Sequence, residues 1–166
     1  LKCRYAFYTA QSYKDCNQIE NSIIWYKKII HELDNWYQEK FYSCLMCGDL
    51  YQRLNDIENS HIYYLKSIDF DKQRIEGILK VCHYYQKKEQ HLLAHLLASK
   101  YKNNSINTSD KLFINVNDHD DQLDFINSIS GYYCNEKNSS FESIIKILKN
   151  KKVKNHQLEL TYQNLK

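Results

Sequence analysis

The sequence contains no proline and only three glycines in 166 residues. Proline interrupts helices, and glycine supplies the left-handed backbone conformations that tight turns need. Their scarcity favours long helices, and it leaves asparagine as the residue best able to form a left-handed turn. Three glycines also provide no phosphate-cradling loop of the kind found in nucleotide-binding proteins.

The sequence also lacks any apolar run near the roughly 18–20 residues that span a bilayer, and it has no signal-peptide pattern. The net charge is only +3, whereas nucleic-acid binding calls for a clustered basic patch. The one dense basic run, KILKNKKVK at 146–154, is expected to be a solvated helix end, with an anionic surface or nucleic acid as the alternative contact. We expect neither a membrane nor a nucleic-acid partner.

The cysteines do not form a disulfide framework. They are scattered along the chain, mostly inside apolar helical patterns, at Cys3, Cys16, Cys44, Cys47, Cys82 and Cys134. This predicts reduced thiols in an intracellular, cytoplasmic protein. Cys44 and Cys47 lie three residues apart, but a structural zinc site needs four ligands and no second pair exists. They are expected to be buried small residues, with a metal or redox role as the alternative.

No combination of residues predicts catalysis. His91 and His95 in HLLAH lie one helical turn apart, but Leu92 stands where a zinc metalloprotease helix carries its general-base glutamate. No serine, histidine and acid can be assembled from the sequence. Fifteen tyrosines fit inter-helix packing better than base stacking. We expect no catalytic residue, no metal ligand and no cofactor.

Two stretches of the chain have nearly the same sequence. IENSIIWYKKII begins at residue 19 and IENSHIYYLKSI at residue 57, after Asn17 and Asn55, which are 38 residues apart. A third copy turns at Glu89, 34 residues after Asn55. The periodic apolar positions predict a helix on each side of every turn. The expected turns are Asn17-Gln18, Asn55-Asp56 and Glu89-Gln90.

Small residues recur where the helices of each hairpin are expected to cross. They are Ala10 and Ser22, Gly48 and Ser60, and Cys82 and Ala94. An aromatic residue follows the first small residue of each pair by three positions, at Tyr13, Tyr51 and Tyr85. Small residues let helices approach closely, and aromatic residues fill the wedge between successive pairs. A period near 34 with this order of residues resembles the tetratricopeptide repeat.

We therefore predict an all-α, right-handed superhelix (an α-solenoid) of tetratricopeptide-like hairpins. It comprises three regular hairpins over residues 1–102, a bridging loop over 103–119, a degenerate fourth hairpin over 120–150 and a capping helix over 151–166. In the fourth copy, Gly131 is expected at the small position, followed by a lengthened turn. The apolar patch Leu112-Phe113-Ile114 is expected to anchor the loop against a neighbouring helix.

Three longer stretches carry a more specific resemblance: RYAFYTAQSYKDCNQIENSIIWYKK, WYQEKFYSCLMCGDLYQRL and DKLFINVNDHDDQLDFINSISGYY. Over roughly residues 4–150 the chain resembles the repeat region that follows the family 2-type (GT-A) catalytic domain in glycosyltransferase-related proteins of bacteria and giant DNA viruses. The abundance of Asn, Lys, Ile and Tyr indicates A+T-rich coding, which is compatible with a giant-virus source. Such a source would place the protein in the host cytoplasm or the virion.

The resemblance implies that the parent protein is a glycosyltransferase or a relative of one, with the repeats positioning the transferase or its acceptor. The transferase itself uses a doubly wound α/β domain with an Asp-x-Asp-like metal motif, and this chain has no βαβ alternation. No catalytic residue is therefore carried over. The DHDD at 118–121 lies in the predicted loop, where His119 stands in place of an aromatic residue favoured by the family.

The concave face of the predicted superhelix is the surface with a functional interpretation, because the first helix of each hairpin lines it. The candidates for partner binding are Arg4, Phe7, Gln11, Lys14, Tyr42, Asp49, Gln52, Arg53, His83, Gln86 and Lys87. Their mixed charge, rich in Arg and Lys, fits a peptide, an acidic tail or a neighbouring catalytic domain; the alternative is a solvated face. We expect a non-catalytic domain for protein–protein or interdomain contacts. A free-standing peptide-binding scaffold and a helical lobe covering an active site remain alternatives.

Overall fold

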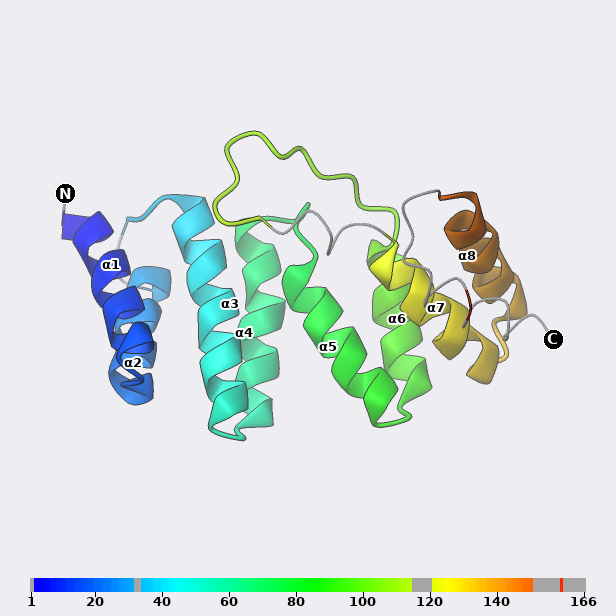
Figure 1. Ribbon diagram of the computed structural model, residues 1–166, viewed down its shortest axis with the longest axis horizontal. Coiled ribbons are helices and arrows are strands. Elements are labelled where there is room, and N and C mark those ends of the chain that lie inside the picture. The colour runs from blue at the N-terminus through cyan, green and yellow to red at the C-terminus, as the bar shows by residue number, and fades with distance from the viewer. Residues whose placement is uncertain (1, 32–33, 115–120, 151–158, 160–166) are drawn as a thin grey trace. The chain divides into compact units, whose positions relative to one another are not determined.

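The computed structural model describes residues 2–31, 34–114, 121–150 and 159, and within them every regular element is a helix (Figure 1). The predicted all-α class is confirmed for these residues. The helices are α1 (Lys2–Asp15), α2 (Ile19–His31), α3 (Tyr37–Arg53), α4 (Ile57–Phe70), α5 (Glu76–Lys87), α6 (His91–Tyr101), α7 (Gln122–Tyr133) and α8 (Lys137–Lys149). No helix in the described ranges has the length and apolar character of a membrane span. The expected capping helix over 151–166 lies outside the described residues except for residue 159.

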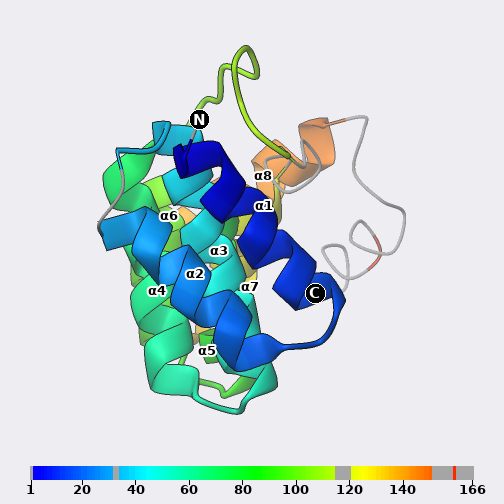
Figure 2. The same ribbon diagram turned by 90° about the vertical axis from the view of Figure 1, so that its left-hand side faces the viewer.

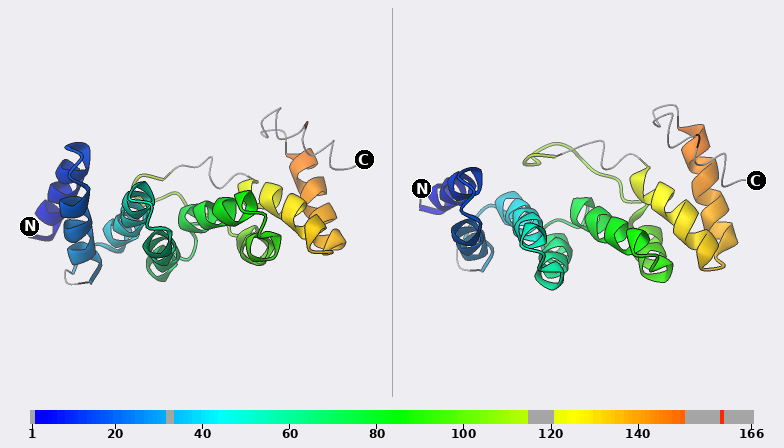
Figure 3. Two further views of the ribbon diagram at one scale, coloured as in Figure 1. Left: turned by 90° about the horizontal axis from the view of Figure 1, so that it is seen from below. Right: turned by 60° about the horizontal axis from the view of Figure 1, so that its bottom comes forward.

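The chain divides into two compact units. The first comprises Leu1–Gly77 together with Asn107–Ile114, and the second comprises Ile78–Ile106 with Asn115–Lys166. In the first unit α1 packs on α2, α2 on α3 and α3 on α4, as the side view in Figure 2 shows. In the second unit α7 packs on both α6 and α8, which Figure 3 shows from two further directions.

One turn geometry joins the two helices of every pair. At each turn a residue adopts a left-handed conformation, with φ between 57° and 63°, at Asn17, Asn55, Glu89 and Asn135. Its amide donates to the carbonyl three residues earlier at 3.0–3.1 Å, and the next amide donates to the carbonyl five residues earlier at 2.8–2.9 Å. These two bonds define a Schellman motif, which satisfies carbonyls at a helix end. The three turns expected from the repeat are confirmed, and asparagine takes the place of glycine in two of them.

The fourth pair, α7 and α8, has the same turn as the others. The expectation of a lengthened turn was wrong, because Asn135 occupies the left-handed position and Glu136 donates to the carbonyl of Gly131 at 2.8 Å. Counting back seven residues from the turn places Ser128, rather than Gly131, at the small position. Gly131 instead stands where the other copies carry tyrosine. A Cβ at Gly131 would lie 3.2 Å from Nδ1 of the buried His95 on α6, which fills this space.

The small residues allow close helix crossings, as the repeat predicted. The Ser22 hydroxyl donates to the carbonyl of Ala10 at 2.9 Å, and Ser140 makes the same bond to Ser128, again twelve residues earlier. At the third such crossing, a Cβ on Gly48 would lie 2.4 Å from the ring of Tyr64. A larger side chain at these positions would force the paired helices apart.

The core of the first unit draws on all four of its long helices. It contains Ala6, Phe7, Ala10, Ile23, Tyr26, Ile29, Ile30, Cys44, Cys47, Leu50 and Tyr63. The predicted burial of Cys44 and Cys47 is confirmed, since both are fully enclosed. Burial raises the pKa of the Cys44 thiol to about 12 and that of Cys47 well above its ordinary value. Both thiols are therefore protonated at neutral pH, a state unsuited to metal ligation or disulfide exchange.

We predict that Gly48→Ala destabilises the protein by about 1–3 kcal/mol, because the new methyl group would overlap the ring of Tyr64. The matched control is Gly131→Ala, whose Cβ would lie 3.2–3.4 Å from its nearest neighbours. Those neighbours need to move by only a few tenths of an ångström, and helix propensity offsets up to about 1 kcal/mol of the cost, so the loss should be smaller. Urea unfolding followed by circular dichroism measures both. Equal effects for the two variants would contradict the packing at Gly48.

Glu89 is the one residue at the four turns that is poorly suited to a left-handed conformation. We predict that Glu89→Asn raises the free energy of unfolding by about 0.5–1 kcal/mol, because asparagine tolerates positive φ better. The reciprocal change, Asn55→Glu, should lower stability by a similar amount. Thermal unfolding measures both changes, and effects of the same sign would show that the turns are not equivalent.

Candidate functional site

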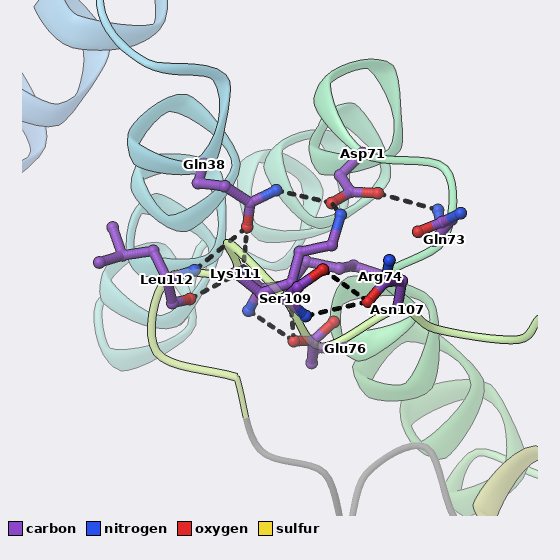
Figure 4. A network of polar contacts seen from close by, with 9 residues as sticks. All are labelled: Gln38, Asp71, Gln73, Arg74, Glu76, Asn107, Ser109, Lys111 and Leu112. Carbon is purple, nitrogen blue, oxygen red and sulfur yellow. Dashed lines mark hydrogen bonds and ion pairs between the residues drawn. The ribbon is translucent and has the colours of Figure 1, made fainter.

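A network of buried polar side chains lies at the end of the α3–α4 hairpin opposite its turn (Figure 4). Gln38 comes from the first turn of α3, Asp71 follows the end of α4, Arg74 lies in the connection that follows, and Glu76 begins α5. All four are buried, with Gln38 and Arg74 almost completely enclosed. We call these four residues the helix-end network.

Arg74 is the centre of this network. Its Nε and Nη2 donate to Oε1 of Glu76 at 2.9 and 2.6 Å, and its Nη1 donates to Oε1 of Gln38 at 2.7 Å. The guanidinium also lies 4.0 Å from the centroid of the Phe41 ring. A buried arginine is stable only when it is neutralised and hydrogen-bonded. Glu76 supplies the charge, and Gln38 and Phe41 complete the surroundings.

Asp71 links the end of α4 to the rest of the network. One carboxylate oxygen accepts from the backbone amide of Gln73 at 3.0 Å, which closes the turn after the helix. The other accepts from Nε2 of Gln38 at 2.6 Å. The helix-end network is therefore held together by bonds among its own members, drawn from α3, the α4–α5 connection and α5.

A non-helical segment from far along the chain, residues 107–114, lies on this network; we call it the docked segment. Lys111 forms an ion pair with Asp71 at 2.5 Å, and both side chains are at most 7% exposed. Both polar groups of the Leu112 backbone form hydrogen bonds with the network. The carbonyl accepts from Nη1 of Arg74 at 2.8 Å, and the amide donates to Oε1 of Gln38 at 3.4 Å. The helix-end network thus binds the segment by its main chain as well as by a side chain.

Aromatic contacts continue from the docked segment into the core of the first unit. The Phe113 ring lies 4.9 Å from the ring of Tyr42 on α3, and Tyr42 lies 5.8 Å from Phe7. Leu112 packs partly against the same core. The apolar patch therefore anchors the loop on α3, as the sequence predicted. Phe113 remains 59% exposed and has a left-handed backbone with φ of 49°, a conformation that costs energy outside glycine and asparagine.

The charges at the site balance. Arg74 pairs with Glu76 and Lys111 pairs with Asp71, so the two positive and two negative side chains balance. Burial by itself would raise the pKa of Asp71, but hydrogen bonds from Lys111, Gln38 and the Gln73 amide, together with the charge of Lys111, lower it below its ordinary value. The carboxylate form of Asp71 is thus the form that the site stabilises.

The residues of the first unit that were predicted to bind a partner do not share one surface. Tyr42 contacts the docked segment, whereas Phe7 is only 3% exposed and belongs to the core, so its place on an open binding face was wrong. Asp49 and Gln52 both accept from the Tyr64 hydroxyl, at 2.7 and 3.1 Å.

The basic candidates of the first unit lie nearer solvent. Arg53 donates to Oδ1 of Asn17 at 2.5 Å, linking the first two turns. Arg4 is exposed, Gln11 and Lys14 are half-buried, and Lys14 lies 3.7 Å from Asp15.

The remaining candidates lie on α5 in the second unit. His83 and Lys87 are exposed and Gln86 is half-buried. On α6, the half-buried His91 stacks on Tyr133 with ring centroids 4.3 Å apart. These contacts agree with the packing role expected of the HLLAH histidines.

None of the five polar side chains that build the site was among the predicted site residues; they are Gln38, Asp71, Arg74, Glu76 and Lys111. In sequence, the stretch that contains Asp71, Arg74 and Glu76 resembles a solvated turn. Only the apolar patch at 112–114 predicted that the bridging loop contacts a helix. Within the described ranges no group of three or more His, Cys, Asp or Glu side chains could hold a metal ion. Asp118, His119 and Asp120 of the DHDD stretch lie outside those ranges.

Comparison of the chain with protein-family models, with curated proteins and with solved structures gives no match.

We predict that Asp71→Asn lowers the free energy of unfolding by about 1–3 kcal/mol at neutral pH, because it leaves the buried Lys111 ammonium group without its partner. The folded-state pKa of Asp71 lies below its ordinary 3.8. Its contribution is therefore complete above about pH 4 and is lost as the pH falls through the folded-state value. Urea unfolding of both proteins between pH 7 and 2 measures the difference.

The control for this prediction is Asp69→Asn, which changes an exposed aspartate in the last turn of α4. A stability loss from Asp71→Asn that is independent of pH would contradict the ion pair with Lys111.

Proposed function

We propose that this chain is a non-catalytic helical-repeat module that binds an extended polypeptide segment, in a protein partner or in a neighbouring domain. The observation that carries the proposal is the docked segment. A non-helical stretch lies on helix ends of the first unit, and Arg74 and Gln38 contact both polar backbone groups of Leu112. Main-chain contacts of this kind give affinity for an extended peptide, while neighbouring side-chain sites give specificity.

We further propose that the hairpins form a right-handed superhelix of tetratricopeptide-like repeats. The identical turns at four positions support this, as do the small-residue crossings twelve residues apart. Packing of α2 on α3 and of α6 on α7 gives each unit a contact between successive hairpins. Repeats of this class present extended surfaces for binding other proteins.

The glycosyltransferase resemblance supports a more specific proposal: the chain is the accessory region of a transferase-related intracellular protein, positioning the catalytic domain or its acceptor. A free-standing scaffold and a helical lobe that covers a transferase active site are the alternatives. The sequence of the parent gene separates them. An upstream α/β segment with an acidic metal motif would support the accessory region, and a parent protein without one would support the scaffold.

Selection of short random peptides on the immobilised chain tests the proposed function. We expect selected peptides to bind with Kd values of about 1–100 µM in isothermal titration calorimetry, and cross-linking should place them on the first helices of the hairpins. The absence of any selected binder, or cross-links confined to α2, α4 and α6, would contradict the proposal.

Charge reversal at two exposed candidates, one in each unit, refines this test. Arg53→Glu and Lys87→Glu should each weaken, by about three- to tenfold, binding of those acidic selected peptides that cross-link to the unit carrying the changed residue. Glu58→Lys, on α4, is the control and should leave the affinity unchanged. Unchanged affinity in both reversed variants would remove these two residues from the binding face.

A further inference from the structure

The docked segment is bound through three consecutive residues, each recognised in a different way. Lys111 pairs with Asp71 and also lies 5.6 Å from the centroid of the Tyr37 ring. Leu112 is held by its backbone and packs against the core, and Phe113 contacts the ring of Tyr42. The site therefore contacts a basic, an aliphatic and an aromatic residue that follow one another along the chain.

The four members of the helix-end network are also bonded to one another. Asp71 accepts hydrogen bonds from Gln38 and from the Gln73 amide, and Arg74 donates to Glu76 and to Gln38. None of these bonds involves residues 107–114. Bonds within the receptor side of the site reduce the ordering cost of binding, which helps a short segment to bind with useful affinity.

Outside the Lys111 and Leu112 contacts, the docked segment has features that weaken its attachment. It has neither helix nor strand, Phe113 is more than half exposed, and two of its non-glycine residues, Asp110 and Phe113, have positive φ. Ordering each backbone residue costs about 1–2 kcal/mol, which offsets much of what its few contacts contribute. An internal segment whose attachment is opposed by these ordering and strain costs can exchange with an outside ligand that makes the same contacts.

We propose that the partner of this site is a protein segment with the order basic–aliphatic–aromatic, and that residues 107–114 are an internal competitor for it. This rests on the proposed function and specifies its ligand. The partner's basic residue takes the place of Lys111 on Asp71, Arg74 and Gln38 hold the backbone of the aliphatic residue, and Tyr42 contacts the aromatic ring. The partner gains access when the docked segment leaves.

The test uses the full chain and a fluorescein-labelled peptide of residues 107–114, NTSDKLFI. In the variant Lys111→Ala/Phe113→Ala the docked segment loses its side-chain anchors. Fluorescence anisotropy should show the peptide binding this variant at least about tenfold more tightly than the wild-type chain, because the internal competitor acts at an effective concentration near millimolar. A peptide with both residues replaced by alanine should bind the variant at least about tenfold more weakly.

A second measurement needs no variant and serves if the substituted chain folds poorly, as circular dichroism would reveal. In hydrogen exchange on the wild-type chain, a saturating excess of NTSDKLFI should speed exchange of the Leu112 amide, while the α3 amides around Tyr42 stay protected. An alanine-substituted peptide should leave the Leu112 rate unchanged.

Equal binding to both chains, indifference to the alanine substitutions, or an unchanged Leu112 rate would overturn the inference. A wild-type dimer that the peptide converts to monomer in light scattering would also overturn it, by assigning the site to the segment of a second copy. If peptides from the random selection bind while NTSDKLFI does not, the inference fails and the proposed function stands. If no peptide binds at all, the proposed function fails.

Discussion

The burial of the Arg74 guanidinium is the constraint on which the site depends. A cation enclosed to this degree must be neutralised and must satisfy its donors, or it would destabilise the fold by several kcal/mol. Glu76, Gln38 and the Leu112 carbonyl meet that requirement, because each accepts hydrogen bonds from the guanidinium group. Residues separated by more than thirty positions in sequence are thereby fixed together, and the end of a helical hairpin holds a segment from a distant part of the sequence.

Local backbone chemistry explains how the helical hairpins of both units are built. Each hairpin closes through a left-handed residue and the same two backbone bonds, and each crossing uses a small residue near the turn. The turn fixes the register of the two helices, the small residues set their separation, and the aromatic residues fill the space left between neighbouring pairs. In the fourth pair Gly131 replaces the aromatic residue, and His95 from α6 fills the space.

Sequence alone predicted the elements that depend on short-range patterns: the helices, three of the four turns, the buried cysteines and the apolar anchor of the loop. It misassigned the fourth turn, because Gly131 resembles a small crossing residue while Ser128 at the true position does not stand out. It also missed the helix-end network. The stretch DKQRIEG has the composition of a solvated turn, and the burial of Asp71, Arg74 and Glu76 within it depends on contacts with α3 and residues 107–114. Phe7 was misplaced for the same reason, since register alone does not show that Tyr26 and Tyr42 enclose it.

The central claim is that residues 107–114 lie on the helix ends of the first unit in solution, and nuclear Overhauser effects between aromatic side chains test it most directly. With the Phe113 and Tyr42 rings 4.9 Å apart, the account predicts cross-peaks between their ring protons, together with ring-current shifts in Phe113. A Phe113 with random-coil chemical shifts and no cross-peak to Tyr42 would contradict it.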